Sequence, residues 1–465
     1  MKPRLKEFSS YAAQLLPHEV LYLLAVQQFQ DPDNQAILER ILHNASSRHA
    51  PLPFDPQIDK RKYSRLKQWI SDKLSSIDVD LQLEWIMELE RKIMTDSISP
   101  GEERDLLRRI RSYQAPYYYF VRFYELALHY RQYLLVRIRH REYGQVQAFI
   151  AGQAAAYRRS LETYERLHQA TVDIVAQYSR NSAESGQWET WLAGVFADET
   201  MDGLNRYLAI VRLTFIYLNY RQFDRLLPQY EVLDGLLRRG TFYSRRILVN
   251  YYANRVLLHT RSGDLQQAAA YGFLSIRQKN ADYLHYVNNL ASVLLRQNDP
   301  AAALKLLQEA LPEARQTSST HSRVGFAALY VRCLVDNQRP LEAEQYAERF
   351  LRGYKEAVFE QRWHLFFSAY LQALLRQEKY DRMLRAVWQY RLMEKEKAYQ
   401  RRAMYLPTLA WYHAVAQYKE GRISREQLAG LLRESGALIG PDEYKQRQLQ
   451  ELTDELRPHI PEVLR

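Results

Sequence analysis

A helical hairpin unit recurs along the C-terminal half of the chain, and this recurrence constrains the fold more than any other feature. Each copy consists of a bulky apolar helix, a short polar turn, and a second helix with small residues near its start. In the clearest copy, residues 283–316, Asp299 suits the N-cap of the second helix and Pro300 its first position. The first helix carries apolar residues at spacings of three and four, which place them on one face: Val287, Leu290, Ala291 and Leu294. Since one hairpin cannot bury both of its apolar faces, the pattern predicts that neighbouring hairpins stack.

The same features return before and after this copy. Ala268 and Ala303 are equivalent small residues, 35 positions apart, and Ala343 and Met383 take the same place in later copies. The corresponding turns are Gly263-Asp264-Leu265, Gln338-Arg339-Pro340 and Glu378-Lys379-Tyr380. Weaker copies cover residues 207–233 and 411–428. Over about residues 200–430 the pattern resembles the tetratricopeptide repeat (TPR), a helical hairpin of about 34 residues that stacks into an α-solenoid.

The resemblance to TPR proteins implies a binding groove, because in that family the first helix of each unit lines a concave face. Transferred to this chain, it implies these partner-binding residues: Asn250, Asn254, Arg261, His285, Asn288, Asn289, Ser292, Arg296, Arg332, Gln372 and Arg376. Asparagine amides can bond to a peptide backbone, and arginines can pair with carboxylates. The implied partner is therefore a protein or peptide with acidic groups. The alternative is that these residues form an ordinary solvent-facing surface.

The rest of the chain is also expected to be helical. Residues 1–114 are interpreted as an N-terminal helical region, with a linker at about 46–59 marked by Pro51, Pro53 and Pro56. Ser99-Pro100-Gly101-Glu102 predicts a helix start with a reciprocal cap. Residues 115–200 are expected to form a long helical hairpin, 201–440 the repeat array, and 441–465 a C-terminal capping helix and tail.

Tyrosines and arginines are interleaved between residues 113 and 143, and this segment gives an alternative function. The arginines of the segment are Arg122, Arg131, Arg137, Arg139 and Arg141, and the tyrosines are Tyr113, Tyr117, Tyr118, Tyr119, Tyr124, Tyr130, Tyr133 and Tyr143. Rings that stack on bases and cations that hold phosphates would suit nucleic acid. Tyrosines around a long helix can equally pack with their hydroxyls at the rim.

Two further resemblances belong to the alternatives. The spacing of Arg122 and His129 resembles the Arg-x4–6-His motif of HEPN ribonucleases, although the residue after the arginine is Phe123. A helical region ahead of TPR-like units also resembles the architecture of the bacterial Rap regulators.

The composition of the chain limits the kinds of partner and the cellular compartment that we expect. Lys and Arg exceed Asp and Glu by 65 to 54, a basic surplus that permits an acidic partner or nucleic acid. Cys333 is the only cysteine, so an intrachain disulfide is excluded and a reducing compartment fits. No apolar signal core and no membrane-length apolar run are found, so we expect a cytoplasmic protein without membrane contact.

Motifs for phosphate loops, dinucleotide binding, zinc or a nucleophile elbow are absent from the sequence. We therefore expect no cofactor, no metal and no enzymatic activity. The sequence predicts an all-α protein that acts as a non-enzymatic protein-binding scaffold, with nucleic-acid binding or regulation as the alternative.

Overall fold

The computed structural model is built from helices throughout the part of the chain it describes, which confirms the predicted all-α class. It describes residues 5–46, 51–114, 116–180, 184–220, 222–400, 405–440 and 443–464, with only the backbone of 178–180. Those residues contain α-helices and one short 3₁₀ helix, and no strand. The chain divides into two compact units, residues 1–248 and 249–465, and the boundary falls within α12 (Arg245–Ser262).

Unit 1 holds the predicted N-terminal region and the long hairpin. Its elements are α1 (Lys6–Ala12), α2 (Pro17–Val26), α3 (Pro32–Ser46), α4 (Lys60–Ile77), α5 (Val79–Met94), α6 (Pro100–Arg111), α7 (Phe120–Val136), α8 (His140–Arg180), the 3₁₀ helix η1 (Gly186–Trp188), α9 (Glu189–Ala197), α10 (Gly203–Tyr220) and α11 (Phe223–Arg238). The described part of the predicted linker, residues 51–59, is non-helical, as its prolines require. The weak repeat expected at 207–233 corresponds to the contacting pair α10 and α11, which lies in unit 1. The four-part division drawn from the sequence stays a prediction.

Local signals placed several of these helices correctly. Helix α6 begins at Pro100, and its cap is reciprocal: the Ser99 amide donates to Glu102 Oε2 at 2.9 Å, and the Glu102 amide donates to Ser99 Oγ at 3.4 Å. Helices α7 and α8, which lie in the region where the long hairpin was expected, pack against each other. Ile138, in the turn between them, has φ +59°, an unfavourable conformation for a β-branched residue.

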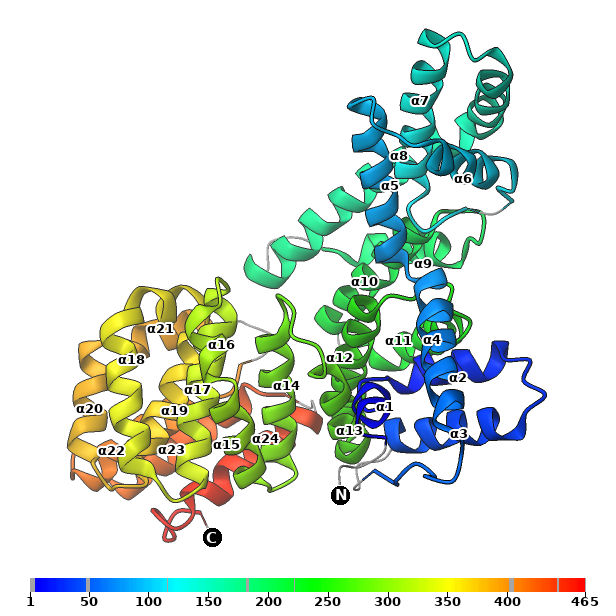
Figure 1. Cartoon of the computed structure of the whole chain (residues 1–465). Coiled ribbons are helices and arrows are strands. Elements are labelled where there is room, and N and C mark those ends of the chain that lie inside the picture. Colours follow the sequence, from blue (N-terminus) through cyan, green and yellow to red (C-terminus); the bar gives the residue numbers. More distant parts are fainter. Residues whose placement is uncertain are drawn as a thin grey trace. The chain divides into compact units, whose positions relative to one another are not determined.

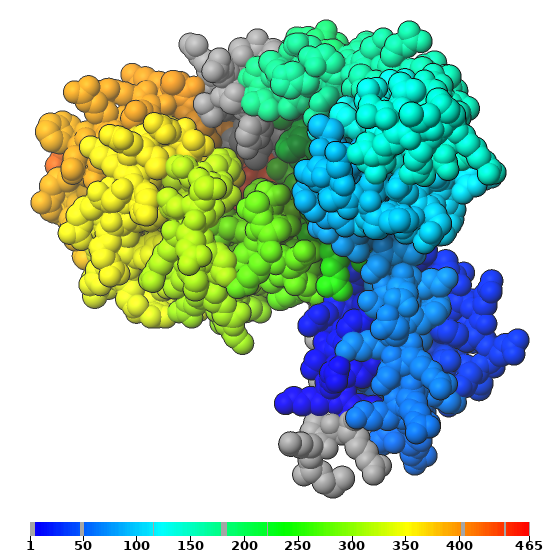
Figure 2. Space-filling view, turned by 45° about the horizontal axis from the view of Figure 1, so that its top comes forward, coloured from blue at the N-terminus to red at the C-terminus, as the bar shows by residue number. Residues whose placement is uncertain are grey.

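Unit 2 continues from α12 as a series of helical pairs (Figure 1). Its other helices are α13 (Leu265–Ser275), α14 (Tyr283–Arg296), α15 (Pro300–Glu309), α16 (Leu311–Gln316), α17 (Thr320–Asp336), α18 (Pro340–Gln361), α19 (Trp363–Leu375), α20 (Tyr380–Gln389), α21 (Leu392–Tyr399), α22 (Thr408–Lys419), α23 (Arg425–Ala437) and α24 (Glu443–Leu456). The first helices pack in succession, α14 on α17, α17 on α19 and α19 on α22. Each also packs on the helix that follows it, respectively α15, α18, α20 and α23. The space-filling view shows α14 to α20 following one another in chain order across one face (Figure 2).

Five of the predicted hairpin turns, all of them in unit 2, each contain one residue with a left-handed backbone. These residues, Gly263, Asn298, Gln338, Glu378 and Gly421, have φ between +55° and +83° and lie 35, 40, 40 and 43 positions apart. In four of the turns the next residue donates its amide to a carbonyl five positions earlier; the donors are Asp299, Arg339, Lys379 and Arg422. This is the Schellman arrangement, which ends one helix and redirects the chain. The turns themselves are therefore alike, and the unequal distances between successive turns come from the segments that connect them.

A side-chain amide links each of three successive hairpins to the one before it. Gln297 donates to the carbonyl of Leu265 at 2.8 Å. Asn337 donates to Pro300 at 2.8 Å and Gln377 donates to Pro340 at 3.1 Å. In each case the donor directly precedes the left-handed turn residue, and the acceptor is the first residue of the preceding unit's second helix. We call these three bonds the amide bridges.

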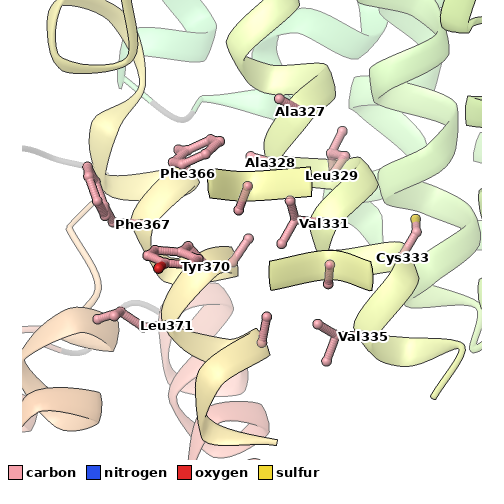
Figure 3. Packing of buried hydrophobic residues seen from close by; sticks show 14 of the residues in the cluster. Ala327, Ala328, Leu329, Val331, Cys333, Val335, Phe366, Phe367, Tyr370 and Leu371 are labelled. Carbon is pink, nitrogen blue, oxygen red and sulfur yellow. The ribbon is translucent and has the colours of Figure 1, made fainter. Parts of the chain in front are cut away.

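The core of unit 2 lies where the helices of the pairs meet. The small residues expected at the start of the second helices, Ala268, Ala303 and Ala343, have no exposed surface, and neither has Met383. Between α17 and α19, Ala327, Ala328 and Val331 lie across from Phe366, Phe367 and Tyr370 (Figure 3). Small residues opposite aromatic ones allow close packing of first helix on first helix.

Candidate partner-binding surface

The C-terminal helix α24 is amphipathic, and it identifies the surface of unit 2 that receives a helix. Leu449, Leu452 and Leu456 recur at spacings of three and four and belong to the apolar core of unit 2 or pack against it. Leu449 lies over Gly436 of α23, where an added Cβ would meet Leu449 Cδ2 at 3.7 Å. The leucine face thus anchors α24 to the end of unit 2, and a different face remains for polar contacts.

At the start of α24, Tyr444 meets two arginines from the first helices of two units. The guanidinium carbon of Arg261, on α12, lies 4.0 Å from the centroid of the Tyr444 ring, and that of Arg296, on α14, lies 5.5 Å away. Arg296 also donates from Nη1 to the carbonyl of Thr260 at 3.2 Å, which fixes its position. A cation over a tyrosine face contributes about 0.5–2 kcal/mol, depending on desolvation.

At the end of α24, Glu455 meets the first helices of the later units. Tyr412 of α22 donates to Glu455 Oε1 at 3.0 Å. Burial raises the pKa of Glu455, and this outweighs hydrogen bonding from Gln372 and Tyr412, which lowers it. The positive charges of Arg332 and Arg376 also lower the pKa of Glu455, which shows that both arginines lie near it.

The two arginines near Glu455 also act on a carboxyl group of the array itself. Arg332 Nε lies 3.7 Å from Asp336 Oδ2. Burial raises the pKa of Asp336, and the charges of Arg332 and Arg376 oppose this rise. Arg332 and Arg376 therefore act on two carboxyl groups, Asp336 of α17 and Glu455 of α24.

We call the side chains that surround α24 the α24-facing surface. Its members are Arg261 of α12, Arg296 of α14, Arg332 of α17, Gln372 and Arg376 at the end of α19, and Tyr412 of α22. Five of the six are residues that the TPR resemblance implied. Tyr412 was not predicted, because a tyrosine within an apolar stretch is expected to belong to the hydrophobic core. Only its hydroxyl group can form a hydrogen bond with a partner.

Four of the other predicted residues bond in pairs toward the start of the same helices. The Asn254 amide donates to Asn250 Oδ1 at 3.2 Å, and the Asn250 amide donates to Tyr286 Oη at 3.4 Å. Asn289 Nδ2 lies 3.3 Å from His285 Nε2. Burial, followed by the charge of Arg362, lowers the pKa of His285. The structure places these residues on α12 and α14.

Asn288 differs from its predicted role. It is only 5% exposed, and its amide donates to the carbonyl of Ser322 at 3.0 Å, which joins α14 to α17. This bond explains the asparagine within a helix, and it leaves Asn288 out of reach of a partner. Ser292, also on α14, is half-buried. The burial of Asn288 therefore argues against its assignment to partner binding, and the assignment of Ser292 stays a prediction.

Two residues near this group were missed by sequence reasoning. Arg362 donates from Nε to His321 Nε2 at 2.8 Å, and Gly325 provides the space for the guanidinium, since an added Cβ would lie 3.0 Å from Arg362 Nη1. Burial, followed by the charge of Arg362, lowers the pKa of His321 to about 4, so this imidazole is neutral at neutral pH. Arg362 lies in the short break between α18 and α19, where no repeat position could identify it.

The tyrosine and arginine segment of unit 1 is used for packing. Tyr118, Tyr124 and Tyr130 are buried, and the other tyrosines that remain partly exposed pack around the same core. Tyr130 donates to Glu103 Oε2 at 2.7 Å, and Arg139 pairs with the same carboxylate. The three buried rings therefore cannot stack on bases, and the others contribute part of their surface to packing.

Two other arginines of this segment, Arg122 and Arg137, also pair with side chains of the protein. Arg137 lies 3.8 Å from the centroid of Tyr133 and pairs with Asp96 at 2.6 Å. Arg122 pairs with Glu125 at 3.0 Å, and His129 Nε2 lies 3.3 Å from Glu90 Oε1. Arg122 and His129, the two residues of the ribonuclease-like spacing, thus each contact a different carboxylate.

No family model matches this sequence, and neither a curated protein nor a solved structure matches the chain.

The described residues contain no group of three or more His, Cys, Asp or Glu side chains arranged to hold a metal ion. Cys333 is buried, and burial raises the pKa of its thiol to about 12, so it is protonated and unreactive at neutral pH. Among the helices that the structure describes, none is long and apolar enough to cross a membrane.

Proposed function

We propose that unit 2 is a TPR-like α-solenoid that binds a protein segment along the concave face of its first helices, without catalysing a reaction. The observation that carries this proposal is the convergence of five predicted residues, from four successive first helices, on a single guest helix. Arg261 and Arg296 lie over the Tyr444 ring at one end of α24, while Gln372, Arg332 and Arg376 lower the pKa of Glu455 at the other end.

The repeated backbone supports the solenoid part of the proposal. Equivalent left-handed turns and successive first-helix packing are expected of stacked hairpins. The amide bridges repeat the same contact between neighbours in three places. In such a stack each unit contributes one row of side chains to a shared face, and four arginines on this face suit an acidic protein segment.

The test compares two charge-reversal variants of the full chain as bait for proteins from native extract. Arg296→Glu with Arg376→Glu reverses two charges on the α24-facing surface. Arg352→Glu with Arg433→Glu makes the same change at exposed positions of α18 and α23, the second helices of their pairs. We expect a partner, quantified by mass spectrometry, to be retained by wild type and by the α18/α23 variant and lost by the first variant. Equal retention by both variants would refute the assignment of this face.

A further inference from the structure

We propose that the α24-facing surface takes a helical partner segment with an aromatic ring and an acid side chain on one face, and that α24 is an internal competitor for it. This inference rests on the proposed function and specifies both the partner and its regulation.

The geometry of α24 specifies what a competing segment must offer. Tyr444 and Glu455 are eleven positions apart, which in an α-helix places them on the same face, about 16 Å apart along the axis. The surface supplies stacking cations for the ring at one end and hydrogen-bond donors with two positive charges for the acid at the other. A leucine stripe on an adjacent face, as in α24, would fill the apolar site beside Gly436.

Helix α24 is suited to leave this site because it is weakly anchored compared with the helices around it. Of its fourteen residues only Leu452 and Leu456 are almost completely buried and Glu455 is partly buried, whereas ten of the thirteen residues of α19 are buried. Its contacts with the arginines are made through long side chains at its two ends. A segment with little buried surface opens at lower free energy than the core that it covers.

The position of α24 also favours competition over end-capping. A helix that only closed the array would contact the last units, as the leucine face does with α23. Tyr444, however, meets α12 and α14, which are the first helices of the first two units of unit 2. α24 thus extends back along the helices that would receive a partner, and both cannot occupy the surface at once.

The test weakens α24 within the full chain and leaves the receiving surface unchanged. The variant Tyr444→Ala with Glu455→Ala removes two polar anchors of α24, and Arg447→Ala with Gln450→Ala changes two exposed positions of the same helix. The probe is a fluorescent synthetic peptide with the sequence of residues 443–464. Hydrogen exchange of residues 443–456 reports whether α24 has opened, and anisotropy reports peptide binding.

We expect at least tenfold faster exchange of α24 in the anchor variant and at least tenfold tighter peptide binding than in wild type. The exposed-position variant should match wild type in both measurements. Adding Gly436→Leu to the anchor variant should abolish peptide binding, because a larger side chain there meets Leu449 of the peptide. Adding Gly430→Leu, in the same helix but with nothing within 4 Å of its added Cβ, should not.

Equal peptide affinity for wild type and the anchor variant, with α24 opened in the latter, would overturn the proposal. A concentration-dependent dimer of wild type that exchanges α24 between chains would also overturn it, since the occupant would then be a second copy. If a native partner requires Arg296 and Arg376 but binds wild type and the anchor variant equally, the competition fails while the proposed function stands. If the partner does not require these arginines, the proposed function fails whatever the peptide does.

Discussion

The amide bridges give a prediction about what holds successive hairpins in register. The perturbation is the triple variant Gln297→Ala, Asn337→Ala and Gln377→Ala, which removes the three side-chain donors to the second helices of the preceding units. The donors lie at the ends of first helices or just beyond them, so a gain in helix propensity from alanine is small.

The magnitude follows from the number and kind of bonds. Each neutral hydrogen bond contributes about 0.5–1.5 kcal/mol net. Asn337 and Gln377 also donate to carbonyls of their own helices, Cys333 at 2.6 Å and Ala373 at 2.9 Å, so each loses more than the bridge. Because the bridges lie in different units, their effects should add, to about 2–4 kcal/mol for the triple variant.

The assay combines urea unfolding of the full chain with hydrogen exchange at the starts of α13, α15 and α18. A matched control removes three exposed glutamines from second helices, Gln308→Ala, Gln345→Ala and Gln389→Ala. We expect about 1 kcal/mol, or roughly fivefold faster exchange, at each bridge for the single variants. If the bridge triple variant loses no more stability than the control, these bonds do not hold the units together.

Three other changes test local features. Gly272→Ala should destabilise the chain by about 1–3 kcal/mol in a thermal melt, because the new Cβ would lie 2.6 Å from Leu290 Cδ1. Gly353→Ala should instead stabilise the chain by about 0.5–1 kcal/mol, because nothing lies within 4 Å of the new Cβ. Because the pKa of Glu455 is raised in the folded chain, its stabilising effect is full at low pH and is lost as pH rises through the raised pKa. Glu455→Gln should therefore match wild type in urea unfolding near pH 4 and exceed it at pH 8, and the reverse order would contradict this assignment. Ile138→Gly should stabilise by about 1 kcal/mol, since φ +59° strains a β-branched residue that is 73% exposed, and an unchanged midpoint would show that the strain is absent.

The sequence predicted the helices and turns well because their signals are local. The caps at Ser99 and Asp299 and the turn glycine at Gly421 act within a few residues, so each can be recognised without knowing the fold. The apolar stripes likewise fixed which side of each hairpin is buried. Such signals specify where a helix begins and ends and which of its faces is buried. They do not specify which other part of the chain packs against that face.

The candidate site was predictable only in part for the same reason. The arginines of the first helices were found by their repeat position, but their guest was expected to close the end of the array. Tyr444 reaches Arg261 over more than 180 positions of chain, a contact that no local pattern encodes. Asn288 was assigned to the groove because no nearby residue in the sequence explains an asparagine within a helix. Its hydrogen-bond acceptor is the Ser322 carbonyl, a backbone atom of another helix, which the sequence does not reveal.

The left-handed turns have a consequence for how this chain can change in length. One backbone conformation sets how the two helices of each hairpin meet, while α18 extends to 22 residues and the hairpins start at unequal intervals. Residues can therefore be added to the second helices or between hairpins without changing the conformation of the turns. Evolution can thus change the period of the sequence while the first helices keep packing on one another.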